Sequence, residues 1–257
     1  HSARGIGRYS LSMAQALVRA RTDHTVYIAL NGAFPESIES IRGAFHGVLP
    51  QDHIRVWNTP GPVCGSDPDN DWRRKVGERQ REAVLASLEP DVVLVSSLFE
   101  GFLDDAVTSI GTFDTQTKTA AILYDFIPLV FADHYLADTA MNRWYGSKLD
   151  HVRRTDCLLA ISETTRSDAI DRVGLAPESV FTISGAADDQ FCPRTLDSNA
   201  KEGLRAKYGL NGDFILYTGG IEWRKNVEGL LRGYAQLPKG LRRRHQLTIV
   251  CEISDHS

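Results

Sequence analysis

The sequence has little cysteine, no long apolar run and no excess of positive charge. It holds four cysteines in 257 residues, none at C-x-x-C spacing, which excludes a disulfide scaffold and indicates reduced thiols in a cytosolic protein. No apolar stretch approaches the ~18 residues that a membrane-spanning helix needs. The formal net charge is −4, which argues against a protein that binds nucleic acid through bulk electrostatics.

The chain also lacks an initiating methionine, and no signal-peptide pattern accompanies its opening, HSARGIGRYS. A glycine loop that enters a helix usually follows a strand, and that first strand is missing here. At the other end, an α/β pattern has just restarted when the sequence reaches Ser257. We therefore expect a fragment of a longer protein, truncated at both ends.

Short apolar segments alternate with amphipathic ones. The pattern predicts strands at 24–30, 53–58, 91–97, 119–128, 156–162 and 179–186. It predicts helices after the glycine turn at residues 5–7 and at 36–44, 72–88, 138–153 and 163–174. Ser162 is the expected N-cap of the last of these helices and Gly174 its C-terminal stop. Such alternation predicts an α/β fold with a parallel sheet.

The pattern also indicates two domains. Residues 1–190 are predicted to form a Rossmann-like N-terminal domain without its first strand. Residues 191–212 are polar and contain a proline, as expected of an inter-domain passage. A strand at 213–218, a helix at 224–236 and a strand at 246–251 then begin a second Rossmann-like domain, so 213–257 is its incomplete start.

The stretch GGIEWRKNVEGLL, residues 219–231, has the composition of an anion site. Gly219 and Gly220 follow an apolar strand and would let the backbone approach a ligand. Arg224 and Lys225 fall at the predicted start of a helix, where cations are unfavourable unless an anion is bound. The stretch predicts a phosphate site, and the alternative is a solvated helical turn with two surface cations.

Further candidates lie in the first domain. Gly5 and Gly7 resemble half of a dinucleotide fingerprint, which fails at Ser10, so a tight turn before a packed helix is the alternative. Asp125 and Glu100 each follow an apolar strand, and active-site residues of open α/β sheets gather at such carboxyl ends. A turn-forming aspartate and a surface carboxylate are the respective alternatives.

No metal site is expected. The acidic stretch DPDND, residues 67–71, is followed by Trp72 where a calcium loop needs glycine, so it is interpreted as a solvated loop. The histidines show no H-x-x-x-H pattern. The cationic stretch 241–245 is interpreted as a solvated turn, with contact to an anionic membrane as the alternative.

Five motifs carry a resemblance to a known family. GIGRY, YDFIP, LAISETTRSD, GAADDQFCP and YTGGIEWRKNVEGLL occur in this order. Together they resemble glycosyltransferase family 4, the retaining GT-B enzymes that use nucleotide sugars. SSLFEG and DHYL are similar to its bacterial mannosyltransferase-like branch, which builds surface polysaccharide. The resemblance covers nearly the whole chain and implies two Rossmann-like domains, with the acceptor on the first and the sugar nucleotide on the second.

The resemblance also implies roles for the candidate residues. Donor phosphate would be bound by Arg224, Lys225, Gly219, Gly220, Gly5 and Gly7. Glu100 would contact the acceptor, and Arg8 would do so too unless it is simply solvated. Asp125 would be catalytic, at a position where many relatives have histidine. The family needs neither a bound metal nor an organic cofactor.

The expected activity is transfer of a hexose, such as mannose from GDP-mannose, to a glycan or lipid-linked acceptor with retention. The parent enzyme is expected in the cytoplasm, with peripheral attachment to the inner face of the membrane. The donor motif that the family carries further along its second domain is absent, so the fragment itself is expected to be inactive. The alternatives are a non-catalytic module that binds glycan or nucleotide sugar, and a GT-B sugar-nucleotide epimerase. A dinucleotide oxidoreductase is disfavoured by the failed fingerprint.

Overall fold

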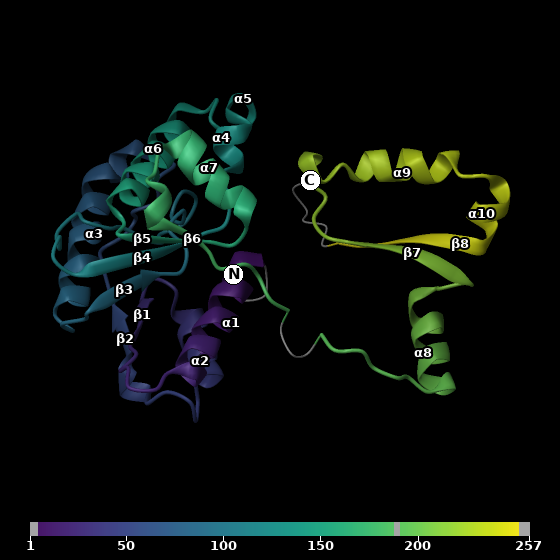
Figure 1. Ribbon diagram of the computed structural model, residues 1–257, viewed down its shortest axis with the longest axis horizontal. Coiled ribbons are helices and arrows are strands. Elements are labelled where there is room, and N and C mark those ends of the chain that lie inside the picture. The colour runs from purple at the N-terminus through teal and green to yellow at the C-terminus, as the bar shows by residue number, and fades with distance from the viewer. Residues whose placement is uncertain (1–4, 188–190, 252–257) are drawn as a thin grey trace. The chain divides into compact units, whose positions relative to one another are not determined.

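The computed structural model describes residues 5–187 and 191–251 (Figure 1). The chain forms two compact units, residues 1–188 and residues 189–257. The first unit holds a four-stranded sheet in the order β3-β4-β5-β6 and a two-stranded sheet of β1 and β2. Every pair is parallel, so the predicted parallel α/β class is confirmed. The strands are β1 (Ile28–Asn31), β2 (Ile54–Trp57), β3 (Val92–Val95), β4 (Lys118–Leu123), β5 (Cys157–Ala160) and β6 (Val180–Thr182).

Helices and short helical turns connect these strands. They are α1 (Gly5–Ala20), α2 (Pro35–Ala44), η1 (Gln51–His53), η2 (Pro68–Asn70), α3 (Asp71–Ala86), α4 (Ile127–Val130), α5 (Ala132–Tyr135), α6 (Thr139–Arg154), α7 (Glu163–Val173) and η3 (Pro177–Ser179). The caps predicted for α7 are confirmed. The Ser162 hydroxyl accepts a hydrogen bond from the Thr165 backbone N–H, and Gly174 ends the helix at φ +76°.

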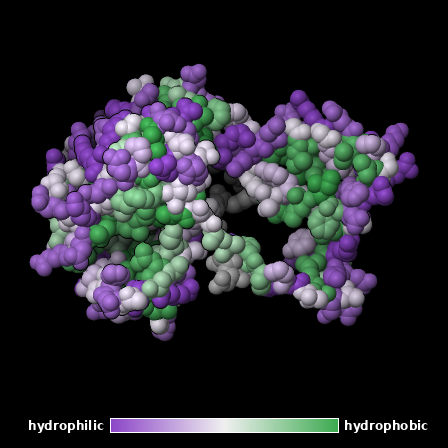
Figure 2. Space-filling model, in the orientation of Figure 1, coloured by the Kyte–Doolittle hydropathy of each residue, from purple (hydrophilic) through white to green (hydrophobic). Residues whose placement is uncertain are grey.

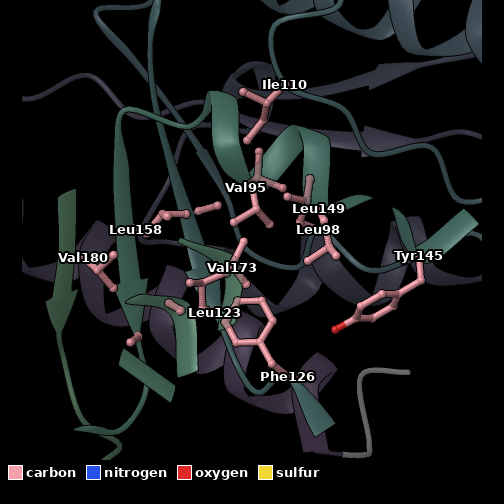
Figure 3. Packing of buried hydrophobic residues seen from close by; sticks show 14 of the residues in the cluster. Val95, Leu98, Ile110, Leu123, Phe126, Tyr145, Leu149, Leu158, Val173 and Val180 are labelled. Carbon is pink, nitrogen blue, oxygen red and sulfur yellow. The ribbon is translucent and has the colours of Figure 1, made fainter. Parts of the chain in front are cut away.

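The main core of the first unit lies between the four-stranded sheet and its helices (Figure 3). Ala121, Leu158 and Ala160 of the central strands are completely buried. Val152 of α6 and Ala169 of α7 are also fully buried against this sheet. Because full burial of a side chain such as valine or leucine contributes about 1.5–3 kcal/mol, this packing fixes the strands and therefore their carboxyl ends.

Several segments differ from the prediction. The strand expected at 119–128 ends at Leu123, and the strand expected at 24–30 begins only at Ile28. The stretch 59–71 is more ordered than its composition indicates. The Asp105 carboxylate accepts hydrogen bonds from the backbone N–H groups of Val63 (2.7 Å) and Cys64 (3.1 Å), and thereby ties this stretch to the segment after β3.

The second unit is a parallel pair of strands with helices. Its elements are α8 (Ser198–Tyr208), β7 (Asp213–Thr218), η4 (Trp223–Lys225), α9 (Val227–Gln236), α10 (Lys239–Arg244) and β8 (His245–Val250). The turn predicted for 241–245 is wrong, since these residues end α10 and start β8. Apolar side chains gather between β7 and α9 on the visible face of this unit (Figure 2). Among the described residues of the chain, no helix is long and apolar enough to cross a membrane.

Candidate functional site

In the first unit, candidate side chains meet at the carboxyl edge of the sheet. Glu100 follows β3, and Tyr124 and Asp125 follow β4 directly. Because β3 and β4 are parallel neighbours, both segments leave the sheet at the same edge. The negative charge of Glu100 contributes to raising the pKa of Tyr124, which places the two segments within electrostatic reach. This edge is the candidate site of the first unit.

The start of α1 packs on the same edge. The Tyr124 hydroxyl donates a hydrogen bond to the Ser96 carbonyl (3.0 Å) and lies 3.0 Å from the Ser10 hydroxyl. The Tyr9 hydroxyl donates to the carbonyl of Ser184, after β6 (3.1 Å). The rings of Tyr9 and Tyr124 meet edge to face at 5.6 Å. These contacts bring the first helical turn, with Gly5 and Gly7, to the ends of the strands.

Sequence reasoning missed Tyr9, Ser10 and Tyr124. The available signal was a pair of hydroxyl-bearing residues that begins two positions after Gly7, and a tyrosine directly after an apolar strand. Burial raises the pKa of the Tyr124 phenol, the Ser10 hydrogen bond lowers it, and the charges of Tyr9 and Glu100 raise it further. The phenol therefore stays protonated and keeps its bond to Ser96 at neutral pH.

Replacing Tyr124 by phenylalanine tests the anchoring of α1. We expect Tyr124→Phe to lower the free energy of unfolding by about 1–2 kcal/mol, because the Ser96 carbonyl and the Ser10 hydroxyl lose their shorter contact and keep only the 3.5 Å bond to each other. Urea unfolding followed by circular dichroism measures this loss. Tyr27→Phe is the matched control, since the exposed Tyr27 ring stacks on His53 at 4.5 Å without a hydroxyl contact in the described structure. An equal loss in both variants would contradict the anchoring role.

Asp125 is exposed. One of its carboxylate oxygens forms a turn, which was the alternative to a catalytic role. Its Oδ1 accepts a hydrogen bond from the Ile127 backbone N–H at the start of α4 (3.0 Å). Within the described residues, Oδ2 has no hydrogen bond. The Glu100 side chain is half-buried, and its Oε1 accepts a hydrogen bond from the Ser97 hydroxyl (2.6 Å). Both carboxylates thus keep an oxygen for a further partner.

The sequence predicted a separate glycine turn before the first helix, and this prediction is wrong. Gly5 and Gly7 already belong to the first turn of α1, because the chain becomes helical at Gly5. Gly5 is exposed and has φ +25°, whereas Gly7 and Arg8 are half-buried. The glycines therefore offer a ligand the free backbone N–H groups of the first helical turn, and not those of a loop.

In the second unit, the candidate phosphate loop follows β7. Gly219 has φ +153°, a conformation that side chains rarely allow, and its N–H donates to the Val250 carbonyl (3.2 Å). The Tyr217 hydroxyl donates to the Gly220 carbonyl (2.6 Å), which holds the turn against the strand. Gly219 and Gly220 therefore lie at the carboxyl end of β7, where parallel α/β units bind ligands.

The predicted position of the two cations is corrected by the structure. Arg224 and Lys225 lie in η4, and α9 begins only at Val227, because Asn226 adopts φ +50° and caps the helix by accepting from the Gly229 N–H. The helix dipole argument applied to the first turn therefore does not hold. Arg224 Nε also pairs with Glu222 Oε2 at 2.7 Å, so part of its charge is neutralised. Lys225 is exposed and makes no ion pair among the described residues.

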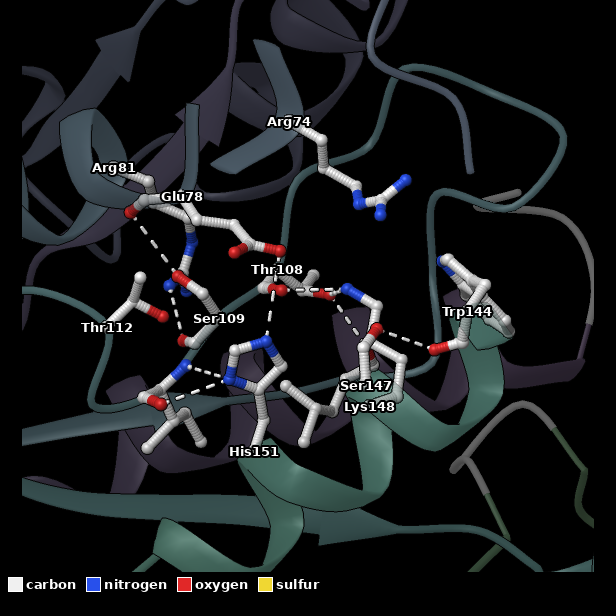
Figure 4. Close-up of polar contacts among 12 residues, drawn as sticks. Arg74, Glu78, Arg81, Thr108, Ser109, Thr112, Trp144, Ser147, Lys148 and His151 are labelled. Atoms are coloured by element: carbon white, nitrogen blue, oxygen red, sulfur yellow. Dashed lines mark hydrogen bonds and ion pairs between the residues drawn. The ribbon is translucent and has the colours of Figure 1, made fainter. Parts of the chain in front are cut away.

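A buried polar cluster between α3 and α6 also escaped sequence reasoning (Figure 4). Lys148 is 1% exposed, and its ammonium donates to the Thr108 carbonyl (2.8 Å) and hydroxyl (2.7 Å). His151 Nε2 lies 3.8 Å from Glu78 Oε1. The detectable signal was the i, i+4 spacing of charged residues on α3 at Arg74, Glu78 and Glu82. Among the described residues, no group of three or more acidic, histidine or cysteine side chains could hold a metal.

Comparison with known proteins extends these observations. No family model matches the chain. It is 30% identical over 251 residues to the serotype-specific mannosyltransferase WbdA of Escherichia coli, and 29% identical over 242 residues to another Escherichia coli WbdA. These alignments cover 97% and 94% of this chain. The chain spans only 30% of the length of either mannosyltransferase.

Two solved structures share the fold. HepE of Anabaena, solved in complex with UDP and glucose, superposes with a TM-score of 0.56 at 16% identity, over 96% of this chain and 58% of HepE. WaaG, a glycosyltransferase involved in lipopolysaccharide biosynthesis, superposes with a TM-score of 0.57 at 16% identity, over 96% of this chain and 60% of WaaG. The chain therefore has the GT-B type of fold that these glycosyltransferases share, and its sequence is similar to that of bacterial mannosyltransferases, as its motifs predicted.

Proposed function

We propose that this chain is part of an enzyme that transfers mannose from a nucleotide sugar, such as GDP-mannose, to a growing glycan or lipid-linked acceptor. The observation that carries the proposal is the similarity to WbdA mannosyltransferases over nearly the whole chain. HepE, which shares the fold, was solved with UDP and glucose, which supports a nucleotide-sugar donor. The proposal includes retention of anomeric configuration and synthesis of surface polysaccharide. It also includes a cytoplasmic location at the inner membrane face.

Each unit, taken by itself, carries groups suited to part of the proposed reaction. At the carboxyl edge of the first unit, Asp125 and Glu100 each keep a carboxylate oxygen that can accept hydrogen bonds from sugar hydroxyls. After β7, Gly219 and Gly220 allow close approach of a diphosphate, and Lys225 supplies an exposed positive charge that has no ion pair among the described residues. Arg224 can add to that charge once its pairing with Glu222 is exchanged for phosphate.

The proposed reaction is a displacement at the anomeric carbon of the donor sugar. The C1–O bond to the diphosphate breaks, a bond to an acceptor hydroxyl oxygen forms, and the acceptor proton leaves with the departing diphosphate. Negative charge grows on that diphosphate, so Lys225 and Arg224 would bind the transition state more tightly than the donor. Asp125 would stabilise positive charge developing at C1 or hold a sugar hydroxyl. Neither a metal nor an organic cofactor is part of this proposal.

The test is a donor panel on the full-length protein that contains this chain. GDP-mannose, UDP-glucose and UDP-galactose are incubated with a lipid-linked glycan acceptor, and nucleoside diphosphate release is measured. We expect release with GDP-mannose, with kcat/KM about tenfold lower in the variant Arg224→Ala with Lys225→Ala, because two charge-assisted phosphate contacts are lost. Nuclear magnetic resonance of the product reads its anomeric configuration.

A matched control removes the same charge elsewhere in the second unit. The variant Arg232→Ala with Lys239→Ala alters two exposed cations of α9 and α10 and is expected to keep the wild-type rate. Equal rates in the wild type and the loop variant would show that the diphosphate is not bound at residues 219–225. Tight binding of a donor without any release would instead identify a non-catalytic binding module.

A further inference from the structure

The two parts of the chain carry charge of opposite sign. Residues 1–190 contain eighteen lysine and arginine residues against twenty-six aspartate and glutamate residues. Residues 191–251 contain eleven against five, so the second unit is cationic although the formal net charge of the chain is −4. Such an asymmetry is typical of proteins that attach to an anionic surface through one of their parts.

The cations of α10 have no acidic partners. The sequence from 229 to 251 contains no aspartate or glutamate, and α10 ends in three consecutive arginines, residues 242–244. All three are exposed, and none forms an ion pair among the described residues. Elsewhere a helical arginine is compensated, as Arg172 of α7 is by Asp168 (2.7 Å). Because neighbouring unpaired cations repel one another, an anionic partner would stabilise this helix end.

Hydrogen bonds fix the end of α10 beside the end of α8 (Figure 1). The Tyr234 hydroxyl of α9 donates to the His245 carbonyl (2.8 Å), directly after α10. Gln246 Nε2 donates to the Gly209 carbonyl at the end of α8 (3.1 Å), and Gln246 Oε1 accepts from the Asn211 N–H (2.9 Å). Both helix ends therefore lie at the amino ends of β7 and β8.

The end of α8 adds two cations and an aromatic ring to this edge. Arg205 Nη1 donates to the Gly212 carbonyl (2.7 Å), directly before β7. The Lys207 ammonium lies 5.1 Å from the centre of the Tyr208 ring, and Tyr208 is 59% exposed. An exposed tyrosine beside cations suits the headgroup region of a bilayer, because its ring is apolar and its hydroxyl polar. We call Arg205, Lys207 and residues 242–244 the cationic edge.

We infer that the cationic edge binds the anionic surface of a phospholipid membrane. The inference deepens the proposed function and rests on it for the presence of a membrane. The acidic residues of the same elements are Glu202 and Asp213, so five cations outnumber two anions. A bilayer engages cations that are spread along an edge, and each of them strengthens the attraction without needing a pocket.

The position of the cationic edge leaves the candidate phosphate loop accessible. Gly219 and Gly220 follow the carboxyl end of β7, whereas the cationic edge lies at its amino end. β7 spans the six residues Asp213–Thr218. At about 3.3 Å per residue, the two ends are roughly 16–20 Å apart. A bilayer at one end therefore does not block a nucleotide sugar at the other.

The test is vesicle binding by the full-length protein that contains this chain. The variant Arg243→Ala with Arg244→Ala removes two exposed cations whose side chains make no hydrogen bond or ion pair within the described residues. We expect its binding constant for phosphatidylcholine vesicles containing phosphatidylglycerol to fall about tenfold below the wild-type value, because two attractive charges are lost. Wild-type binding should weaken as salt rises, and should be absent on pure phosphatidylcholine.

Two controls separate charge from structure. Arg243→Lys with Arg244→Lys keeps the charge and is expected to keep wild-type vesicle binding. Arg224→Ala with Lys225→Ala removes the same charge beyond the other end of β7, and should also bind vesicles like the wild type. Transfer to a soluble mannose-terminated oligosaccharide should be unchanged in Arg243→Ala with Arg244→Ala, because neither residue belongs to the phosphate loop.

The outcomes separate this inference from the proposed function. Equal vesicle binding by the wild type and Arg243→Ala with Arg244→Ala would overturn the inference, and normal transfer to the soluble acceptor would leave the transferase standing. Absence of transfer with every donor would overturn the proposed function, while a charge-dependent loss of vesicle binding would still support the membrane surface. Tighter binding of duplex DNA than of vesicles at the same salt would identify a nucleic-acid surface, and would also overturn the inference.

Discussion

The variant Glu82→Ala is expected to lower the free energy of unfolding by roughly 3–5 kcal/mol. Glu82 is 5% exposed, and its Oε2 accepts hydrogen bonds from three successive backbone N–H groups, those of Thr112 (2.7 Å), Phe113 (2.6 Å) and Asp114 (3.2 Å). Removing the carboxylate leaves these donors without a partner in the described structure. Each unmet buried donor costs about 1–3 kcal/mol, and water at the surface end recovers part of the total.

Urea unfolding of the whole chain measures this loss, and hydrogen exchange locates it. We expect the amides of residues 112–114 to exchange faster in Glu82→Ala than in the wild type, ahead of global unfolding. Lys75→Ala is the control, because Lys75 is exposed on the same helix, and its loss should stay within about 0.5 kcal/mol. A loss below 1 kcal/mol in Glu82→Ala would show that water replaces the carboxylate.

Stability is expected to rise between pH 8 and pH 10 by about 2 kcal/mol, against the usual decline at high pH. Burial lowers the pKa of Lys148 from its ordinary value to about 8. In this window the unfolded chain keeps a proton on Lys148 while the folded chain has released it, so the folded state gains as pH rises. Below pH 8 both states are protonated, and the cost of the buried charge is fully present.

The groups that face Lys148 are Glu78 and Glu100, which favour its charged form, and Arg74 and Arg81, which oppose it. Above pH 10 the raised pKa values of Tyr9, Tyr124 and Tyr145 lower stability, while Arg81, with a pKa lowered to about 10, raises it. The effect of Lys148 on stability is therefore best measured between pH 8 and pH 10. Lys148→Met should flatten the curve there, as measured by urea unfolding at half-unit pH steps, and Lys118→Met, an exposed control, should not. An equal rise in Lys148→Met would refute the assignment.

The sequence by itself determined the parallel α/β class, the succession of strands and helices along the chain, and the caps of α7. These features follow from local rules: apolar periodicity, a serine hydroxyl within reach of the Thr165 N–H, and a glycine that accepts φ +76°. It also indicated that Asp125 and Glu100 share an edge, because residues that follow neighbouring parallel strands must leave the sheet on the same side.

Only the tertiary structure decided which distant residues meet. Ser10 and Tyr124 lie 114 positions apart in the sequence, so no local pattern could pair them. The start of α9 was decided by the backbone of Asn226, whose φ of +50° ends η4 and moves Arg224 and Lys225 out of the helix. Sequence periodicity shows which face of a helix or strand is apolar. The contacts that form a site depend on which other elements that face packs against.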